Sequence, residues 1–185
     1  MNEAMWAFGR VSGIVSLILF TVTLLLGVLT RSGRPLPGLP RFSISLIHRN
    51  TSLLALVFLV LHVGALMLDS YAHLSIADIF VPFLGTYKPF WQGLGTVALD
   101  LVIAIVVTSL FRRRIGARAF KVLHWFTYAM WPIALAHAIG NGTNGTSRFF
   151  LLFAVGSVAV VLAAVVWRMS SRFIESARAR EKAIH

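Results

Sequence analysis

The stretch HRNTSLLALVFLVLH, residues 48–62, begins and ends with histidine and is wholly apolar from residue 53 to residue 61. The uncharged run over residues 50–68 is long enough, at about 1.5 Å per residue, to cross a hydrocarbon layer about 30 Å thick. Backbone groups cannot stay unpaired in lipid, and the run lacks the alternating pattern of a barrel strand. It therefore predicts a transmembrane helix, and its two histidines need a separate explanation.

The rest of the chain is similarly apolar, since 58% of its 185 residues are hydrophobic and only 12% are charged. We expect an all-α integral membrane bundle of five transmembrane helices, with one membrane domain over residues 1–167 and a basic cytoplasmic tail over 168–185. The chain has no cysteine, which excludes disulfides, thiolate metal sites, iron–sulfur clusters and covalent haem attachment. The expected spans are residues 11–29, 50–68, 89–111, 122–139 and 149–167.

The net charge of +11 follows membrane topology rather than a nucleic-acid site. Fourteen of the seventeen basic residues fall between the first and second spans, between the third and fourth, or after the fifth. By the positive-inside rule these regions are cytoplasmic, so we expect an outside N-terminus, a cytoplasmic C-terminus and no nucleic-acid partner. The first span is longer than a signal-peptide core and follows Glu3 rather than a basic cluster, so we expect it to be retained.

Four of the six histidines lie in or at the ends of spans, where ionisable side chains are costly and usually functional. His48 and His62 bracket the second span, and His124 and His137 bracket the fourth. Both spans are expected to run from the cytoplasm outward. His48 therefore matches His124 in depth, and His62 matches His137. Fourteen residues of helix return to within about 40° of the same face, but thirteen do not. A kink at Pro132 is hypothesised to turn His137 toward its partner.

Facing imidazoles at two depths could hold metal ions or flat macrocycles. A zinc or manganese site would usually add carboxylates or further histidines at the same level, and Asp100 is the only acidic residue well inside a span. Two haems need one histidine from each helix at each depth, which is the number present. Any one of these histidines could instead cap a helix or sit in the membrane interface. No ligand role is expected for His73, in an outer loop, or for His185, at the chain end.

Several of these stretches resemble the ferric reductase-like transmembrane domains, which include the membrane part of NADPH oxidases and bacterial haem subunits. The resemblance implies two b-type haems, because the family's ligand spacings of fourteen and thirteen match the two histidine pairs. It implies that His48 and His124 hold the inner iron and that His62 and His137 hold the outer iron. The resemblance covers residues 6 to about 167 and rests on WAFGRVSG (6–13), LIHRNTSLLALVFLVLH (46–62), LGTYKPFWQGLGTVALDL (84–101), TSLFRRRIGARAFKVLHW (108–125) and WPIALAHAIGNGTN (131–144).

The same resemblance implies a di-haem b protein that transfers electrons across a bacterial plasma membrane. Oxidase-type relatives continue into a flavin and nicotinamide module, whereas this chain has no glycine-rich dinucleotide loop and stops about eighteen residues after the fifth span. We therefore expect the membrane haem subunit of an oxidoreductase. Its donor would be quinol or a separate flavoprotein, and its outer-face acceptor a flavin, a metal chelate, a partner reductase or dioxygen.

Four more residues are candidates for cofactor binding. Arg49 and Lys121 could pair with haem propionates at the cytoplasmic surface, although positive-inside charge explains them equally well. Arg10 could bind an outer propionate, or reach the headgroups by snorkelling. Asp100 could accept the remaining ring N–H of an axial histidine, or bond a serine or threonine instead. Two rival functions stay open, namely a transporter or channel that uses the buried His and Asp, and a haem-free assembly subunit.

Overall fold

The structure, a computed structural model, describes residues 2–32, 41–69, 74–170 and 173. Seven helices and no strand occur in these ranges, so the described part of the chain is all-α, as expected. The connector 33–40, His73 and almost all of the expected tail lie outside the described residues. The helices are α1 (Asn2–Ser32), α2 (Arg41–Leu68), α3 (Ile76–Phe80), α4 (Pro89–Leu110), α5 (Arg112–His124), α6 (Thr127–Asn141) and α7 (Arg148–Met169).

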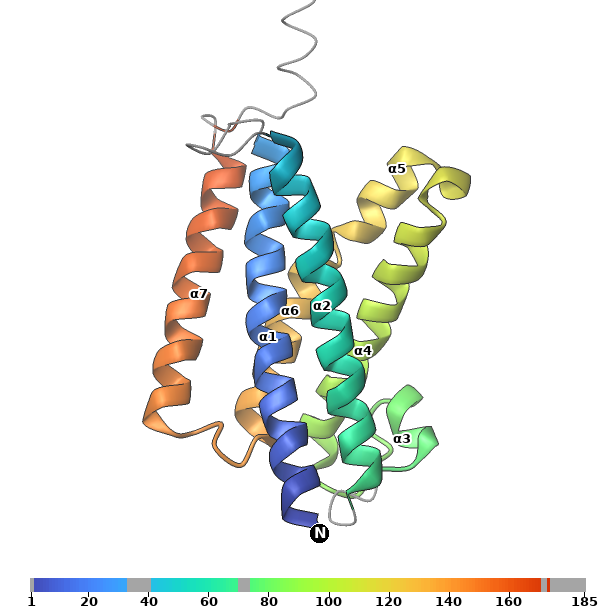
Figure 1. The fold of residues 1–185 in the computed structure, drawn as a ribbon, viewed down its shortest axis with the longest axis vertical. Coiled ribbons are helices and arrows are strands. Elements are labelled where there is room, and N and C mark those ends of the chain that lie inside the picture. Colours follow the sequence, from blue (N-terminus) through green and yellow to red (C-terminus); the bar gives the residue numbers. More distant parts are fainter. Residues whose placement is uncertain (1, 33–40, 70–73, 171–172, 174–185) are drawn as a thin grey trace, which may run out of the picture.

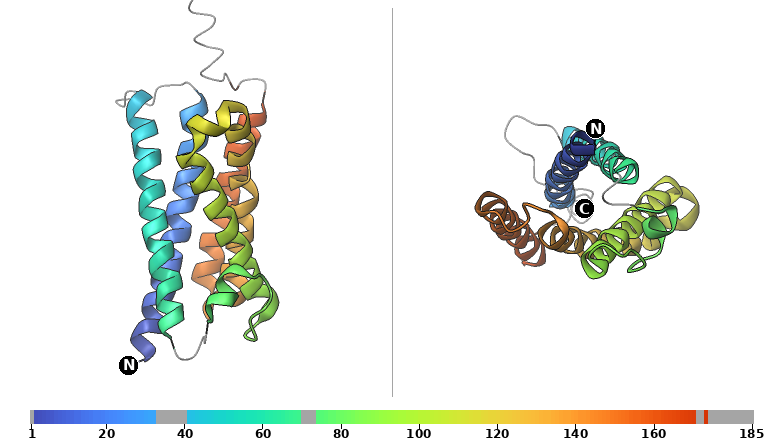
Figure 2. Two further views of the ribbon diagram at one scale, coloured as in Figure 1. Left: turned by 90° about the vertical axis from the view of Figure 1, so that its right-hand side faces the viewer. Right: turned by 90° about the horizontal axis from the view of Figure 1, so that it is seen from below.

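The long helices form two groups that face each other. α1 and α2 lie side by side along the length of the molecule (Figure 1). Seen from below, this pair lies opposite a row formed by α7, α6 and α4 (Figure 2). α1 packs on α6 and α7, and α4 packs on α6, whereas α2 has few backbone contacts with α4 or α6. The candidate site lies between α2 and the α4–α6 pair.

Four helices among the described residues are long and apolar enough to cross a membrane. They match the first, second, third and fifth expected spans. Large apolar side chains on these helices, such as Val60, Leu110 and Phe149, are exposed, as suits contact with lipid chains. The chain is therefore a multi-pass membrane protein. The four candidate spans are Glu3–Ser32, Phe42–Leu68, Pro89–Leu110 and Arg148–Met169.

The fourth expected span is interrupted, which corrects the prediction of one helix over residues 122–139. α5 ends at His124 and α6 begins at Thr127. Between them the N–H of Phe126 bonds to the Leu123 carbonyl at 3.1 Å, three residues back rather than four, so the chain tightens into a turn. α6 is then 15 residues long and is not among the four candidate spans.

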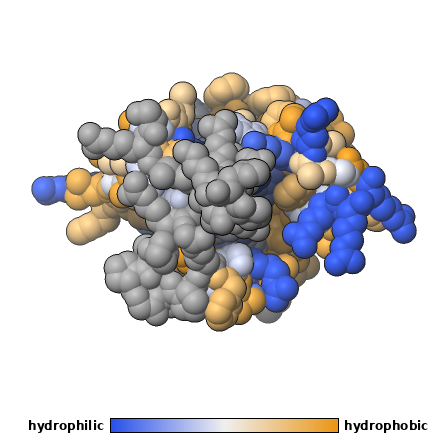
Figure 3. Space-filling view, turned by 90° about the horizontal axis from the view of Figure 1, so that it is seen from above, coloured by the Kyte–Doolittle hydropathy of each residue, from blue (hydrophilic) through white to orange (hydrophobic). Residues whose placement is uncertain are grey.

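The interruption separates a basic segment from an apolar one. The exposed cations of α5 have to stay at the headgroups or in water, and α5 tilts away from the bundle (Figure 1). Seen from above, hydrophilic side chains gather on the side of the molecule where α5 lies (Figure 3). α6 continues through Pro132, and the helical break lies before it, at Trp125 and Phe126; a bend at Pro132 that turns His137 stays a prediction. The cations of α5 are Arg112, Arg113, Arg114, Arg118 and Lys121.

Two buried clusters hold the helices together. α1, α6 and α7 share the first, in which the Trp131 Nε1 donates a hydrogen bond to the Thr21 Oγ1 at 2.9 Å. α4 and α6 share the second. α1 and α2 approach closely at the fully buried Ala55, whose carbonyl accepts a hydrogen bond from the Ser16 hydroxyl at 3.1 Å. The buried members are Leu17, Leu24, Val28, Trp131, Leu135, Ala154 and Val161 in the first cluster, and Ala98, Val102, Ile105 and Met130 in the second.

The short helix α3 was not expected from the sequence. A capping box closes its first turn, because Ser75 and Asp78 each bond the other's backbone N–H. The Thr96 hydroxyl donates to the Asp78 carbonyl at 2.9 Å and so ties α3 to α4. This contact brings Asp78 to the rim of the cavity described below.

Candidate functional site

Four histidines form two ring pairs, one nearer each end of the molecule. The upper pair consists of His48, on α2, and His124, the last residue of α5, with ring centroids 6.4 Å apart and planes at 76°. The lower pair consists of His62, on α2, and His137, on α6, with centroids 6.5 Å apart and planes at 76°. The two levels are about 21 Å apart along α2. The structure thus brings together the histidines that were matched in depth from the sequence.

Hydrogen bonds to backbone carbonyls orient three of the four rings. A carbonyl oxygen can only accept, so the Nδ1 of each of these rings carries the hydrogen, and in the neutral ring the Nε2 then carries the lone pair. This tautomer, with Nδ1–H bonded to a carbonyl, is the one usual for histidines that bind a metal through Nε2. The bonds run from His48 to the Thr23 carbonyl (2.9 Å), from His62 to the Gly9 carbonyl (2.6 Å) and from His137 to the Trp91 carbonyl (2.8 Å).

The space between paired rings has the size of one metal ion bonded to both. Two metal–imidazole bonds of about 2.0–2.1 Å, with each ring centre about 1.1 Å behind its nitrogen, place the centroids about 6.3 Å apart. Both pairs are close to that separation. The described residues contain no group of three or more His, Cys, Asp or Glu that could hold an ion. Two ligands per level therefore suit a metal that brings its other ligands with it, as porphyrin iron does.

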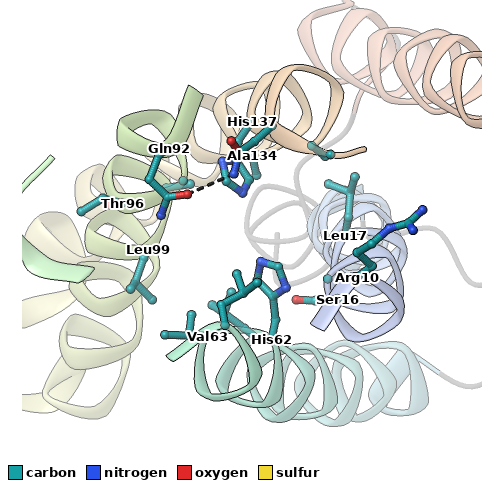
Figure 4. Close-up of a pocket in the computed structure, with 18 of the residues that line it drawn as sticks. Arg10, Ser16, Leu17, His62, Val63, Gln92, Thr96, Leu99, Ala134 and His137 are labelled. Atoms are coloured by element: carbon teal, nitrogen blue, oxygen red, sulfur yellow. Dashed lines mark hydrogen bonds between the residues drawn. The ribbon is translucent and has the colours of Figure 1, made fainter. Parts of the chain in front are cut away.

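A cavity of about 240 Å³ lies at the lower level, among α1, α2, α4 and α6. The rings of His62 and His137 point into it from opposite sides (Figure 4). Its wall is mostly apolar, and the Arg10 side chain is one of its few charged groups. A mostly apolar wall with a cation in it suits an apolar cofactor that carries carboxylates. The apolar wall includes Leu17, Val63, Leu99 and Ala134.

Of the three cations expected to contact propionates, the structure places one in the cavity wall. Arg10 lines the cavity, and its guanidinium carbon lies 4.2 Å from the centre of the Trp6 ring. Arg49 is exposed on α2 next to His48, and Lys121 is exposed on α5. Propionate contacts of all three cations stay predictions.

Asp100 does not accept the ring N–H of three of the four histidines, which corrects that hypothesis for them. The ring hydrogens go instead to backbone carbonyls of α1 and α4, and Asp100 is half-buried on α4. The fourth ring, His124, has a buried Nδ1 with no hydrogen-bond partner among the described residues. Hydrogen bonds therefore hold both rings of the lower pair but only one ring of the upper pair.

Two cations at the upper level were not expected to belong to the site. Arg31 and Arg168 both act electrostatically on His124. Arg168 also donates a hydrogen bond to the Tyr128 hydroxyl, and its guanidinium carbon lies 4.7 Å from the centre of the Trp125 ring. Each is a cation in the last turn of a span, which is a visible signal, but the positive-inside rule accounts for such cations without any site.

Comparison with models of known protein families gives a match over most of the chain. A family model described as "Ferric reductase like transmembrane component" matches residues 12–135, which is more than half of the chain. The matched range includes His48, His62 and His124 and ends just before His137. No curated protein and no solved structure gives a significant match.

Proposed function

Because the chain belongs to the family of ferric reductase-like transmembrane components, we propose that it passes electrons across the membrane through two b-type haems. The geometry of the two histidine pairs, with ring centroids 6.4 and 6.5 Å apart, carries the proposal. His48 and His124 would ligate the upper iron. His62 and His137 would ligate the lower one. A separation of about 21 Å along α2 puts one level in each leaflet of a hydrocarbon layer about 30 Å thick.

A bound b-type haem supplies iron that cycles between the ferric and ferrous states and so carries one electron at a time. The chain's own side chains supply the rest of the site. Each haem would be held by two of the four histidines, so an acceptor would be reduced without binding the iron. The cavity wall at the lower level is mostly apolar, and Arg10 in that wall could pair with a carboxylate. Arg31 and Arg168 offer positive charge at the upper level.

Charge decides the proposed direction. The upper end carries the cations of α5 and the last-turn cations Arg31 and Arg168, and by the positive-inside rule this charge supports a cytoplasmic upper end. Electrons would enter there from quinol or from a separate flavoprotein. They would leave at the lower end, to an outer-face acceptor such as a flavin, a metal chelate, a partner reductase or dioxygen. The proposed location is a bacterial plasma membrane.

A reduced-minus-oxidised absorption spectrum of the purified protein, combined with the molar ratio of haem to protein, tests this function. We expect b-type bands and a ratio of about two, because four histidines supply two bis-imidazole sites. A ratio of about one would overturn the di-haem assignment. A colourless protein after haem-replete expression would overturn the electron carrier. It would favour a transporter or channel that uses the buried His and Asp, or a haem-free assembly subunit.

A further inference from the structure

Three of the four histidine rings lie against a glycine of a neighbouring helix. A Cβ atom added at any of these glycines would come closer to a ring atom than ordinary van der Waals contact allows. Glycine is therefore the residue that leaves room for the ring. The contacts are His62 on Gly13 of α1 (2.7 Å from the added Cβ to Nδ1), His48 on Gly27 of α1 (3.3 Å to Cε1) and His137 on Gly95 of α4 (2.5 Å to Cε1).

Each of these rings also bonds a carbonyl that stands in a fixed relation to its glycine. The acceptor always belongs to the residue four positions before the glycine. In an α-helix that carbonyl already accepts the N–H of the glycine itself, and its second lone pair is left for another donor. The histidine Nδ1–H takes this second place. The acceptors are Gly9 before Gly13, Thr23 before Gly27 and Trp91 before Gly95.

The direction of helical side chains explains why the residue must be glycine. Side chains lean toward the helix N-terminus, so each one covers the turn before its own Cα. The residue four positions after a carbonyl therefore covers it, and a glycine there leaves it open. We call the glycine together with this open carbonyl a glycine seat. A seated imidazole lies against the helix backbone and donates its Nδ1–H to the carbonyl.

The two seats on α1 repeat at the spacing of the histidines that they serve. Gly13 and Gly27 are fourteen residues apart, and so are His48 and His62. α1 and α2 run in opposite directions, and the earlier histidine meets the later glycine. A single register of α1 against α2 therefore seats both rings of α2.

Among the glycines that the structure describes, none forms a seat for the fourth ring, His124. The position fourteen residues after Gly95 on α4 is Ser109. Its hydroxyl donates to the Ile105 carbonyl at 2.6 Å, which is the carbonyl that a seat at this position would leave open. The Nδ1 of His124 is buried and has no hydrogen-bond partner in the described part of the chain. The lower pair thus has two seats and the upper pair has one.

We propose that Gly13, Gly27 and Gly95 are positioning residues for the haem ligands, each fixing the tautomer and rotation of one imidazole through an open carbonyl. This inference rests on the proposed function. An imidazole whose N–H is bonded to a carbonyl is a more basic ligand and stabilises ferric iron. Each seat therefore lowers the reduction potential of the haem that it serves. Two described seats act on the lower haem and one acts on the upper haem.

Alanine substitution of the three glycines in the full-length protein tests the proposal. Gly64→Ala is the matched control, because Gly64 lies on α2 two residues after His62 and an added Cβ there meets nothing within 4 Å. The measurements are the haem-to-protein ratio, a potentiometric titration of each haem and the low-spin ferric signals in electron paramagnetic resonance.

Each substitution should act on one level only. Gly13→Ala and Gly95→Ala should raise the potential and shift the resonance signal of the lower haem, or release that haem. Gly27→Ala should shift the potential and the resonance signal of the upper haem in the same direction but less. The added Cβ there requires the His48 ring to move by only a few tenths of an ångström. Gly64→Ala should match the wild type in all three measurements.

Two outcomes overturn the proposal. A Gly13→Ala protein in which both haems change equally would indicate a general packing defect between α1 and α2. A Gly27→Ala protein with the potentials and signals of Gly64→Ala would show that the seat has no effect on the iron. Gly27→Ala decides the question if the other two variants fail to accumulate. Wild-type protein without haem would instead overturn the proposed function and the seats with it, so the two failures are distinguishable.

Discussion

His48 and His124 face each other with ring centroids 6.4 Å apart, yet within the described part of the chain a hydrogen bond holds only one of the two rings. The Nδ1 of His48 donates to the Thr23 carbonyl, whereas the Nδ1 of His124 is buried without a partner among the described residues. His124 is also the last residue of α5, beside the turn that leads to α6. The upper site therefore has one well-oriented ligand and one that is less constrained.

This difference predicts that the upper haem leaves the protein first. Loss of an orienting partner of a metal-binding histidine lowers metal affinity by about 10- to 100-fold, so transfer to excess apomyoglobin should be at least about 10-fold faster for the upper haem. His62→Ala isolates the upper haem, and His48→Ala isolates the lower haem. Equal transfer rates in these two single-haem proteins would contradict the prediction.

Alanine at His62 or His137 should remove one haem and leave the other, because each iron takes both axial nitrogens from a single pair. The haem-to-protein ratio should fall from about two to about one, and the double variant should hold the same single haem. His73→Ala is the control and should retain both haems, since no ligand role is expected for it. Loss of both haems from either single variant would mean that the two levels are not independent.

Hydropathy was enough to predict most of the fold. Four of the five expected spans match long helices, because lipid demands apolar runs that satisfy their own backbone bonds. The run over residues 122–139 also contains no Asp, Glu, Lys or Arg, so the length of the uncharged run could not reveal its break at Trp125 and Phe126, where basic α5 turns away from the bundle. The helix α3 was not predicted but could have been, since Ser75 and Asp78 have the spacing of a capping box.

Histidine spacing predicted which rings meet but not what holds them. Asp100 was the obvious acceptor, because a sequence displays side chains and gives no sign of which backbone carbonyls are open. The bonds go to carbonyls of α1 and α4 instead. The sequence signal of each open carbonyl is a glycine four residues later. Gly13 and Gly27 have the same fourteen-residue spacing as His48 and His62. That pattern acquires meaning only when α1 is known to pack on α2.

Arg168→Gln should lower the potential of the upper haem and leave that of the lower haem unchanged. The guanidinium lies over Trp125 and Tyr128 and acts on His124, and a nearby positive charge favours ferrous iron. Its removal should change the free-energy difference between ferric and ferrous haem by on the order of 1 kcal/mol, or about 40 mV for one electron. A potentiometric titration measures this shift. Arg148→Gln, exposed in the first turn of α7, is the control. Equal shifts at both haems would point to the general surface charge.

Asp100→Asn should retain both haems with unchanged spectra and potentials. Three of the four ring hydrogens are bonded to carbonyls, so the carboxylate of Asp100 is not needed to orient those ligands. Potentiometric titration beside the wild type measures this. A rise in the potential of the upper haem would show instead that Asp100 serves His124, whose Nδ1 has no hydrogen-bond partner among the described residues.

Cysteine labelling can determine the orientation of the chain, because the natural sequence contains no cysteine. Arg113→Cys, exposed on α5 at the upper end, should be protected from a membrane-impermeant maleimide in intact cells and labelled after permeabilisation. Asn144→Cys, exposed between α6 and α7 at the lower end, should be labelled in intact cells. Both expectations follow from the concentration of cations at the upper end. The opposite labelling pattern would place α5 outside, and electrons would then have to enter at the level of His62 and His137.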